Sequence, residues 1–163
     1  TKWNDMGEAH ILKSEGRLAQ SRGEYEKAEQ FYTETVRLRV KHGKKIQTSF
    51  GRFHLSEALL LQGKFVEAET EARKGLSEIL EVAGSTFPST GYHVFGLSRI
   101  LLSTGRYDEA KLLADTALKI FSESAPLDNK SLPVSALRYI LMLSAVMTED
   151  WPAAIEQATP TSP

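Results

Sequence analysis

The four histidines are the first residues to consider, because imidazole is the side chain best suited to proton transfer and metal binding near neutral pH. They fall on different predicted elements and form no His-x-x-x-His pair: His10, His42, His54 and His93. His54 and Glu57 stand three apart on one predicted helix, a spacing more typical of a surface pair than of an acid–base couple. The sequence also lacks cysteine, a Gly-rich phosphate loop and a nucleophile-elbow motif. It therefore predicts no catalytic residue, no metal site, no cofactor and no enzyme.

Five basic residues gather around the end of the second predicted helix: Arg37, Arg39, Lys41, Lys44 and Lys45. Such a cluster can bind phosphates or an acidic partner. It is more typical of a solvated helix C-terminus, where the helix dipole favours cations. Lys and Arg number 20 against 21 Asp and Glu, for a net charge of −1, and a nucleic-acid binder usually carries a clear basic excess. We therefore expect no nucleic-acid partner.

Composition indicates a folded chain of ordinary size. Its 163 residues are 41% hydrophobic and 25% charged, which suits one compact domain. No apolar run approaches the roughly 20 residues that cross a bilayer, and no secretory signal opens the chain. The absence of cysteine fits a reducing compartment. We expect a cytoplasmic protein without a membrane partner.

An internal repeat dominates the sequence. The pattern Gly, any residue, aromatic, two polar or small residues, Ala occurs three times, at Gly23–Ala28, Gly63–Ala68 and Gly105–Ala110. A fourth copy, Glu149–Ala154, replaces the glycine with glutamate. The alanines are spaced by 40, 42 and 44 residues. Periods of this length are typical of helical solenoids.

Each position of the pattern has a physical reason. Glycine adopts the left-handed conformation that ends one helix and starts a tight turn. The aromatic residue begins the next helix, and the alanine keeps a small side chain where two helices approach closely. Seven residues before each glycine the side chain is also small: Gly16, Ser56 and Ser98.

Apolar spacing of three and four residues between the turns predicts helices throughout, with no strand pattern. The expected helices are about 5–21, 24–42, 47–62, 64–82, 88–104, 106–124, 132–148 and 150–158. The connectors are short, so neighbouring helices must be antiparallel. We expect residues 159–163 to be disordered.

The pattern resembles the tetratricopeptide repeat family over nearly the whole chain. Its period exceeds the usual 34 residues and is similar to the long variant in kinesin-light-chain-like repeats and some bacterial regulators. The resemblance implies an all-α, α-α superhelix with three full repeats and a truncated fourth. The repeats span about 5–43, 46–84, 88–125 and 131–158, within a single domain over 1–158.

The resemblance also implies a concave groove lined by the first helix of each repeat, where peptides bind. Groove positions lie at fixed offsets before each turn glycine, and these offsets include Gln20 and His54. The principal candidates are Lys13, Arg17, Phe50, Phe53, Glu57, Tyr92, Phe95, Arg99 and Tyr139. The hypothesis is an aromatic floor with cationic flanks, suited to a peptide with apolar anchors and an acidic group. The alternative is that these aromatic residues are core.

Two known subtypes of the family are not supported. Lys13 matches the first position of the clamp that grips chaperone C-termini, but Arg17 and His54 stand where that clamp has asparagine. The asparagine ladder of kinesin-light-chain helices is also absent, so we expect neither a chaperone-tail binder nor a cargo adaptor.

We therefore expect a non-catalytic scaffold that binds a peptide or protein segment in the groove. The alternative is a sensory or regulatory arm of a larger, possibly bacterial, regulator, controlled by peptide or small-ligand binding. The segment 136–147 is apolar except for Arg138 and Ser144. A helix of this kind requires burial on most sides, which predicts further repeats or self-association through it.

Overall fold

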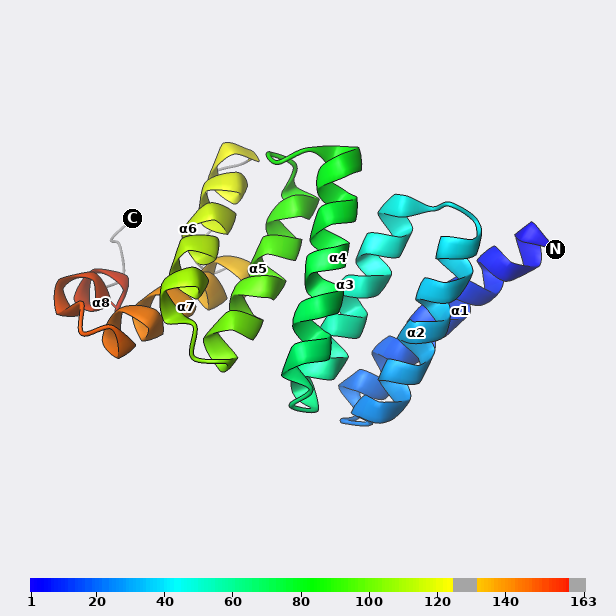
Figure 1. The fold of residues 1–163 in the computed structure, drawn as a ribbon, viewed down its shortest axis with the longest axis horizontal. Helices are drawn as coiled ribbons and strands as arrows, with labels where there is room; N and C mark the ends of the chain where they lie inside the picture. Colours follow the sequence, from blue (N-terminus) through cyan, green and yellow to red (C-terminus); the bar gives the residue numbers. More distant parts are fainter. Residues whose placement is uncertain (125–131, 159–163) are drawn as a thin grey trace. The chain divides into compact units, whose positions relative to one another are not determined.

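Helices account for all the regular structure in the described part of the chain. A computed structural model describes residues 1–124 and 132–158, and it contains no strand there (Figure 1). The helices are α1 (Lys2–Ser21), α2 (Tyr25–Lys41), α3 (Lys45–Leu61), α4 (Phe65–Ala83), α5 (Pro88–Ser103), α6 (Tyr107–Ser124), α7 (Leu132–Met147) and α8 (Trp151–Ala158). The predicted all-α class is confirmed. The predicted connector 125–131 and disordered tail 159–163 lie outside the described residues.

The repeated corners have one backbone geometry. Gly23, Gly63 and Gly105 adopt φ angles of 77°, 75° and 77°. At the first corner the Gly23 N–H donates to the Gln20 carbonyl over 3.1 Å, and the Glu24 N–H donates to the Ala19 carbonyl over 3.0 Å. This pair of bonds is the Schellman motif, and the other corners repeat it. The predicted role of the corner glycines is confirmed.

The fourth corner keeps this geometry without glycine. Glu149 has a φ angle of 60°, and the Asp150 N–H donates to the Ala145 carbonyl over 2.8 Å. The left-handed conformation is unfavourable for a residue with a Cβ atom. The backbone at Glu149 is therefore strained, and the repeat pattern holds despite it.

The chain forms two compact units. Unit 1 spans Thr1–Val82 and contains α1 to α3 with nearly all of α4, and unit 2 begins at Ala83 and contains α5 to α8. The predicted single domain over 1–158 stays a prediction, and each unit is described by itself below.

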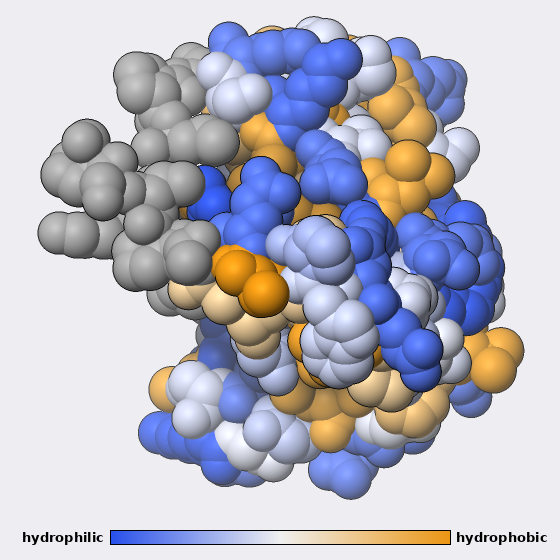
Figure 2. Space-filling model, turned by 90° about the vertical axis from the view of Figure 1, so that its left-hand side faces the viewer, coloured by the Kyte–Doolittle hydropathy of each residue, from blue (hydrophilic) through white to orange (hydrophobic). Residues whose placement is uncertain are grey.

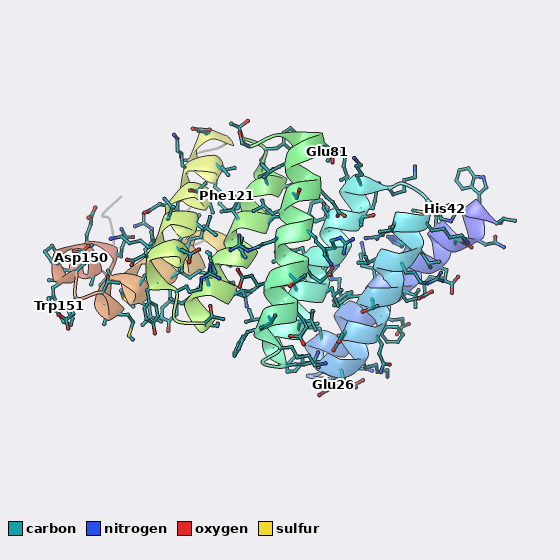
Figure 3. The ribbon with its side chains drawn as sticks, in the orientation of Figure 1. Glu26, His42, Glu81, Phe121, Asp150 and Trp151 are labelled. Atoms are coloured by element: carbon teal, nitrogen blue, oxygen red, sulfur yellow. The ribbon has the colours of Figure 1, made fainter. Side chains whose placement is uncertain are left out.

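Unit 1 is held by small residues at helix contacts and by ion pairs between helices. Ala28 and Ala68, the signature alanines, are fully buried. Asp5 of α1 accepts hydrogen bonds from Lys41 over 2.7 Å and from His42 over 2.9 Å, at the end of α2 labelled in Figure 3. Further pairs join α3 to α4: Arg52 with Glu71 and Glu78, and Lys45 with Glu81.

Unit 2 has a more apolar core. The α5 residues Leu97 and Ile100 are buried, as are the α7 residues Leu137 and Ile140. Helix α7, the predicted apolar segment, packs against α5, α6 and α8. Its burial is incomplete, because Tyr139 is 56% exposed.

The end of unit 2 that carries α8 exposes apolar side chains. Figure 2 shows orange surface there between hydrophilic side chains. Met147, Trp151 and Ile155 are all at least half exposed, and Trp151 lies at the outer edge of this end (Figure 3).

Candidate functional site

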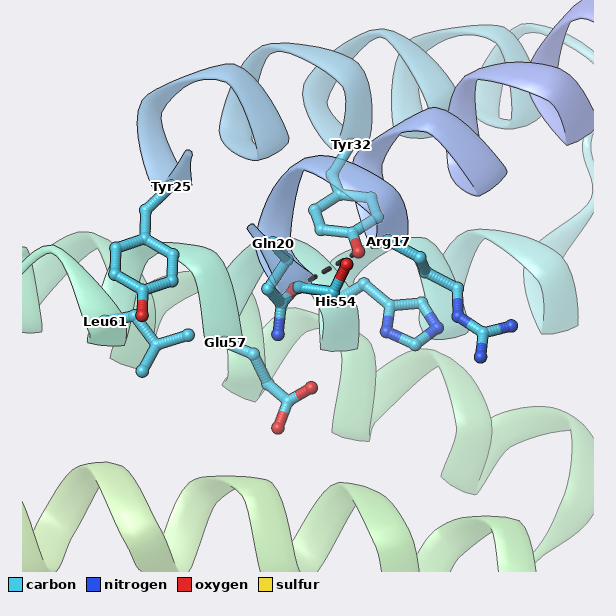
Figure 4. A pocket seen from close by; sticks show the side chains of 8 residues that line it. Arg17, Gln20, Tyr25, Tyr32, His54, Glu57 and Leu61 are labelled. Carbon is cyan, nitrogen blue, oxygen red and sulfur yellow. Dashed lines mark hydrogen bonds between the residues drawn. The ribbon is translucent and has the colours of Figure 1, made fainter. Parts of the chain in front are cut away.

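A pocket of about 320 Å³ lies in unit 1, among α1, α2 and α3 (Figure 4). Its size is in the range of ligand pockets that hold an amino-acid side chain or a short peptide segment. The lining residues are Arg17, Gln20, Ser21, Tyr25, Tyr32, His54, Glu57 and Leu61.

Helical periodicity places these side chains together. Arg17, Gln20 and Ser21 are spaced three and four apart on α1, so they share one face of that helix. His54, Glu57 and Leu61 follow the same rule on α3. The first helices of two successive repeats thus form the walls, and two tyrosines of α2 fill the space between them.

Tyr32 forms the floor of the pocket. Its side chain is fully buried, its hydroxyl donates to Gln20 Oε1 over 3.1 Å, and its ring stacks on His54 with the centroids 5.4 Å apart. The ring fits because residue 16 is glycine. A Cβ atom at Gly16 would lie 2.5 Å from Tyr32 Cε1, closer than side chains approach in proteins.

The floor tyrosine is a hydrogen-bond donor at neutral pH. Burial and, to a smaller extent, the charge of Glu57 together raise the pKa of Tyr32 to about 12, against an opposing effect of Arg17. The phenol therefore remains protonated and holds Gln20 in position. Its role in the pocket is to fix the shape and the hydrogen-bonding direction of the wall.

The walls carry charges of both signs. Figure 4 shows the Arg17 guanidinium beside the His54 ring, with the Glu57 carboxylate below them. Among the described residues Arg17 has no ion-pair partner. An arginine of this kind can bind a carboxylate or phosphate in bidentate fashion, while Gln20 offers an amide for a peptide backbone.

The predicted groove residues of unit 1 divide into two groups. Arg17 and Glu57 line the pocket. Lys13 lies one helical turn before Arg17 on α1 and is not among the lining residues. Phe50 and Phe53 are half-buried on α3 and do not line it. The Phe53 ring instead meets the His54 ring edge-on at 5.5 Å.

The predicted groove residues of unit 2 lie on two neighbouring helices, α5 and α7. Tyr92 is 42% exposed and Tyr139 is 56% exposed. The Tyr92 ring meets Phe121 edge-on at 5.1 Å. Arg99 lies over the Phe95 ring at 5.6 Å, and both side chains are half-buried.

The structure divides the five groove aromatics between the two alternatives, because the tyrosines are exposed and the phenylalanines are mostly buried. Of the five, Tyr92 and Tyr139 are exposed, and the three phenylalanines are intermediate. They remain accessible at least in part.

Four lining residues were not among the predicted candidates: Ser21, Tyr25, Tyr32 and Leu61. Tyr25 and Tyr32 lie on α2, whereas the predicted offsets apply only to the first helix of each repeat. Ser21 and Leu61 are on first helices, at positions that those offsets skip. A signal for Tyr32 was nevertheless present, because the positions equivalent to it in later repeats are Ala72 and Ala114. An aromatic residue at this position, together with glycine at position 16, indicates that the helices of the first repeat pack differently from those of the later repeats.

The basic cluster near the end of α2 is largely neutralised. Arg37 pairs with Glu34, Lys41 with Asp5, and Lys45 with Glu81. Arg39 is buried. These contacts favour the ordinary solvated helix end over a phosphate-binding patch.

The described ranges hold neither a metal-binding cluster nor a membrane-spanning helix. No cluster of three or more histidine, aspartate or glutamate side chains there could hold a metal ion. No described helix combines the length and the apolarity that crossing a membrane demands.

Comparisons of sequence gave no relative. No protein-family model matches the chain, and no curated protein matches it in sequence.

Comparisons of structure gave close matches. BtubC (BKLC) from P. vanneervenii superimposes with a TM-score of 0.80 and 17% identity over 92% of this chain and 60% of that one. A kinesin-light-chain-like protein of Podosopora anserina with nearly identical TPR-like repeats gives 0.79 and 17%, over 91% of this chain and 70% of that one. This chain therefore spans about 60% of the length of the first protein. The predicted TPR-like solenoid fold is confirmed.

Proposed function

We propose that this chain is a non-catalytic interaction module and that the pocket of unit 1 binds an extended segment of a peptide or protein. The supporting observation is the cavity of about 320 Å³ between α1 and α3, the first helices of successive repeats. The pocket combines the guanidinium of Arg17, which has no ion-pair partner among the described residues, with amide and carboxylate groups and an apolar wall from Leu61 and Tyr25.

These groups define the ligand. Leu61 and the Tyr25 ring suit an apolar anchor side chain. The Glu57 carboxylate can accept from a backbone N–H, and the Gln20 side-chain NH2 can donate to a backbone C=O. Both backbone groups need such partners when an extended segment leaves water. Arg17 suits an acidic group. We therefore expect a segment in which an apolar residue lies close to an acidic one.

The aromatic residues of unit 2 form a second candidate surface. Tyr92 and Tyr139 expose large amphipathic rings on neighbouring first helices, and such rings are enriched where interfaces gain their affinity. Arg99 is already held over Phe95, so we expect it to contribute less to binding than Arg17.

The test is peptide selection on the intact chain, followed by affinity measurements on folded variants. We expect Arg17→Ala to weaken the binding of a selected peptide by about tenfold, because one hydrogen-bonded contact to a charged group is lost. Phe53→Ala and Arg99→Ala test the wider groove. Circular dichroism and thermal unfolding establish that each variant is folded. Unchanged affinity in all three variants would refute groove binding.

Two further predictions belong to this proposal. The apolar surface at the α8 end, formed by Met147, Trp151 and Ile155, suits self-association or a further repeat. Light scattering at rising protein concentration tests self-association.

The proposed cytoplasmic location is inferred from the absence of cysteine.

A regulatory arm remains the alternative function. It requires that the bound segment change the activity of an attached or associated domain, in addition to occupying the pocket. Measuring the activity of such a partner with and without ligand separates the two.

A further inference from the structure

Two cations follow one another along the groove face of α1. Lys13 and Arg17 are four residues apart, so they lie one above the other on the helix. Like charges at this spacing repel and destabilise a helix slightly. Among the described residues neither side chain has an ion-pair or hydrogen-bond partner.

A third cation is buried in α2. Arg39 is only 6% exposed. Its Nη1 donates to the Gln47 carbonyl over 2.6 Å, and its Nε has no partner. Burial lowers the pKa of this guanidinium. A buried arginine is normally paired with a carboxylate, and here it meets a neutral carbonyl.

The three charges act on one another. Burial lowers the pKa of Lys13, and the charges of Arg39 and Arg17 lower it further. The two arginines are therefore close enough to repel the Lys13 ammonium. A region of uncompensated positive charge beside a cavity raises the local concentration of anions.

Other cations between helices of unit 1 are paired, which makes this trio unusual. Arg52 contacts Glu71 and Glu78, and Lys64 contacts Glu29. Cations that link two helices of unit 1 thus pair with carboxylates. Within the described residues no carboxylate pairs with Lys13, Arg17 or Arg39.

We propose that Lys13 and Arg17 form a site for an oxyanion, the carboxylate or phosphoryl group of the segment that occupies the pocket. Buried Arg39 adds a fixed positive charge that acts on Lys13, and it does not contact the ligand. Glu57, on the facing wall, repels an anion and so confines it to the Arg17 side. This inference rests on the proposed function, because the anionic group belongs to the bound segment.

The test uses small anions on the intact chain. Inorganic phosphate and, separately, sodium acetate are titrated at pH 7.5 and constant ionic strength, and amide shifts are followed by NMR. We expect saturable shifts on α1 around residues 13–17, and at least about tenfold weaker binding in the double variant Lys13→Met with Arg17→Gln.

A matched control removes the same charge elsewhere. Lys27 and Arg37 are exposed on α2, each beside a glutamate three residues earlier. The double variant Lys27→Met with Arg37→Gln should bind the anion as the unmodified chain does. Equal weakening in both double variants, or no saturable shift in the unmodified chain, would overturn the proposal.

The two anions separate the sources of the charge. Saturation by phosphate alone assigns the site to a phosphoryl group, and saturation by both shows that a carboxylate suffices. Failure of this site is distinguishable from failure of the proposed function. A selected peptide whose affinity is unchanged by the Lys13 and Arg17 variants but falls with Leu61→Ala, a change in the apolar wall of the pocket, refutes the anion site alone.

Discussion

The first and third repeats share one corner geometry, yet they fill the space between their helices differently. In unit 1 Gly16 on the first helix faces the large ring of Tyr32 on the second. In unit 2 the equivalent positions hold Ser98 and Ala114, and both are fully buried. Both arrangements close-pack the hairpin, but only the first brings a phenol and a stacked imidazole to a cavity.

The difference shows how a repeat protein can form a site without altering its scaffold. The corner and the signature alanine are kept, so the hairpin closes in the same way. What differs is how volume is divided between two facing positions. In the third repeat both residues are small, whereas in the first repeat a glycine faces a large aromatic ring that lies at the floor of a pocket. Variants that change the side-chain volume at these two positions therefore have the largest expected effects on stability.

Tyr32→Ala should be the most damaging single change, because it leaves a large cavity beside a glycine. Loss of a buried aromatic side chain costs about 3–5 kcal/mol of unfolding free energy. Adding Gly16→Ser recreates the pair found in the third repeat and should recover part of this loss. Urea denaturation of the single and double variants measures the coupling. Strict additivity would contradict direct packing of the two residues.

Gly16→Ala alone should destabilise the chain by about 1–3 kcal/mol, because its Cβ overlaps the Tyr32 ring. The matched control is Gly7→Ala on the same helix, where a Cβ meets nothing within 4 Å. That change should stabilise the chain by about 0.5–1 kcal/mol, since alanine is the better helix former. Thermal unfolding of both variants decides, and the same sign for both would count against the account.

The two units also differ in their ion pairs. Arg52→Met should cost about 1–3 kcal/mol, because it strands Glu71 and Glu78 in a largely buried place. Lys111→Met, which removes the more exposed pair with Asp150 in unit 2, should cost less than about 1 kcal/mol. Chemical denaturation at pH 7 compares the two losses.

Acid should reduce the Arg52 effect. Burial raises the pKa of the Glu71 carboxyl, but hydrogen bonds from Lys74 and Arg52 outweigh it and leave the pKa below its ordinary value of 4.5. A lowered pKa stabilises the fold above the unfolded value and loses this contribution as the pH falls through the folded value. The gap between the unmodified chain and Arg52→Met should therefore narrow below about pH 4.5. A gap independent of pH would exclude the ion pair as its cause.

The corners offer a smaller contrast. Glu149→Gly should stabilise the chain by about 1 kcal/mol, because glycine relieves the positive φ at that position. Gly63→Ala should destabilise it by about as much or somewhat more, since the same conformation is then imposed on alanine. Differential scanning calorimetry would detect both shifts, and no gain from Glu149→Gly would argue against strain.

The sequence predicted the features that depend on local chemistry. Glycine at a left-handed corner and Pro88 at the start of α5 are determined by backbone preference, so their roles followed from residue type. The predicted helix starts and ends fall within three residues of the observed ones, with α1 beginning at Lys2 instead of about 5.

The site was less accessible to sequence reasoning. Arg17 and Glu57 followed from periodicity along one helix, and both line the pocket. Tyr32 reaches it from another helix, through packing on Gly16 and stacking on His54. Which residues face each other across two helices depends on their relative volumes. The spacing of residues along one helix gives no information about this pairing.

The most direct test of the account is chemical-shift mapping of the intact chain with a peptide selected on it. We expect the largest shifts at the pocket residues of α1 and α3, and their loss in Arg17→Ala. Shifts confined to the outer surface of α2 or α4, with Arg17→Ala binding unchanged, would contradict the claim that this pocket is the binding site.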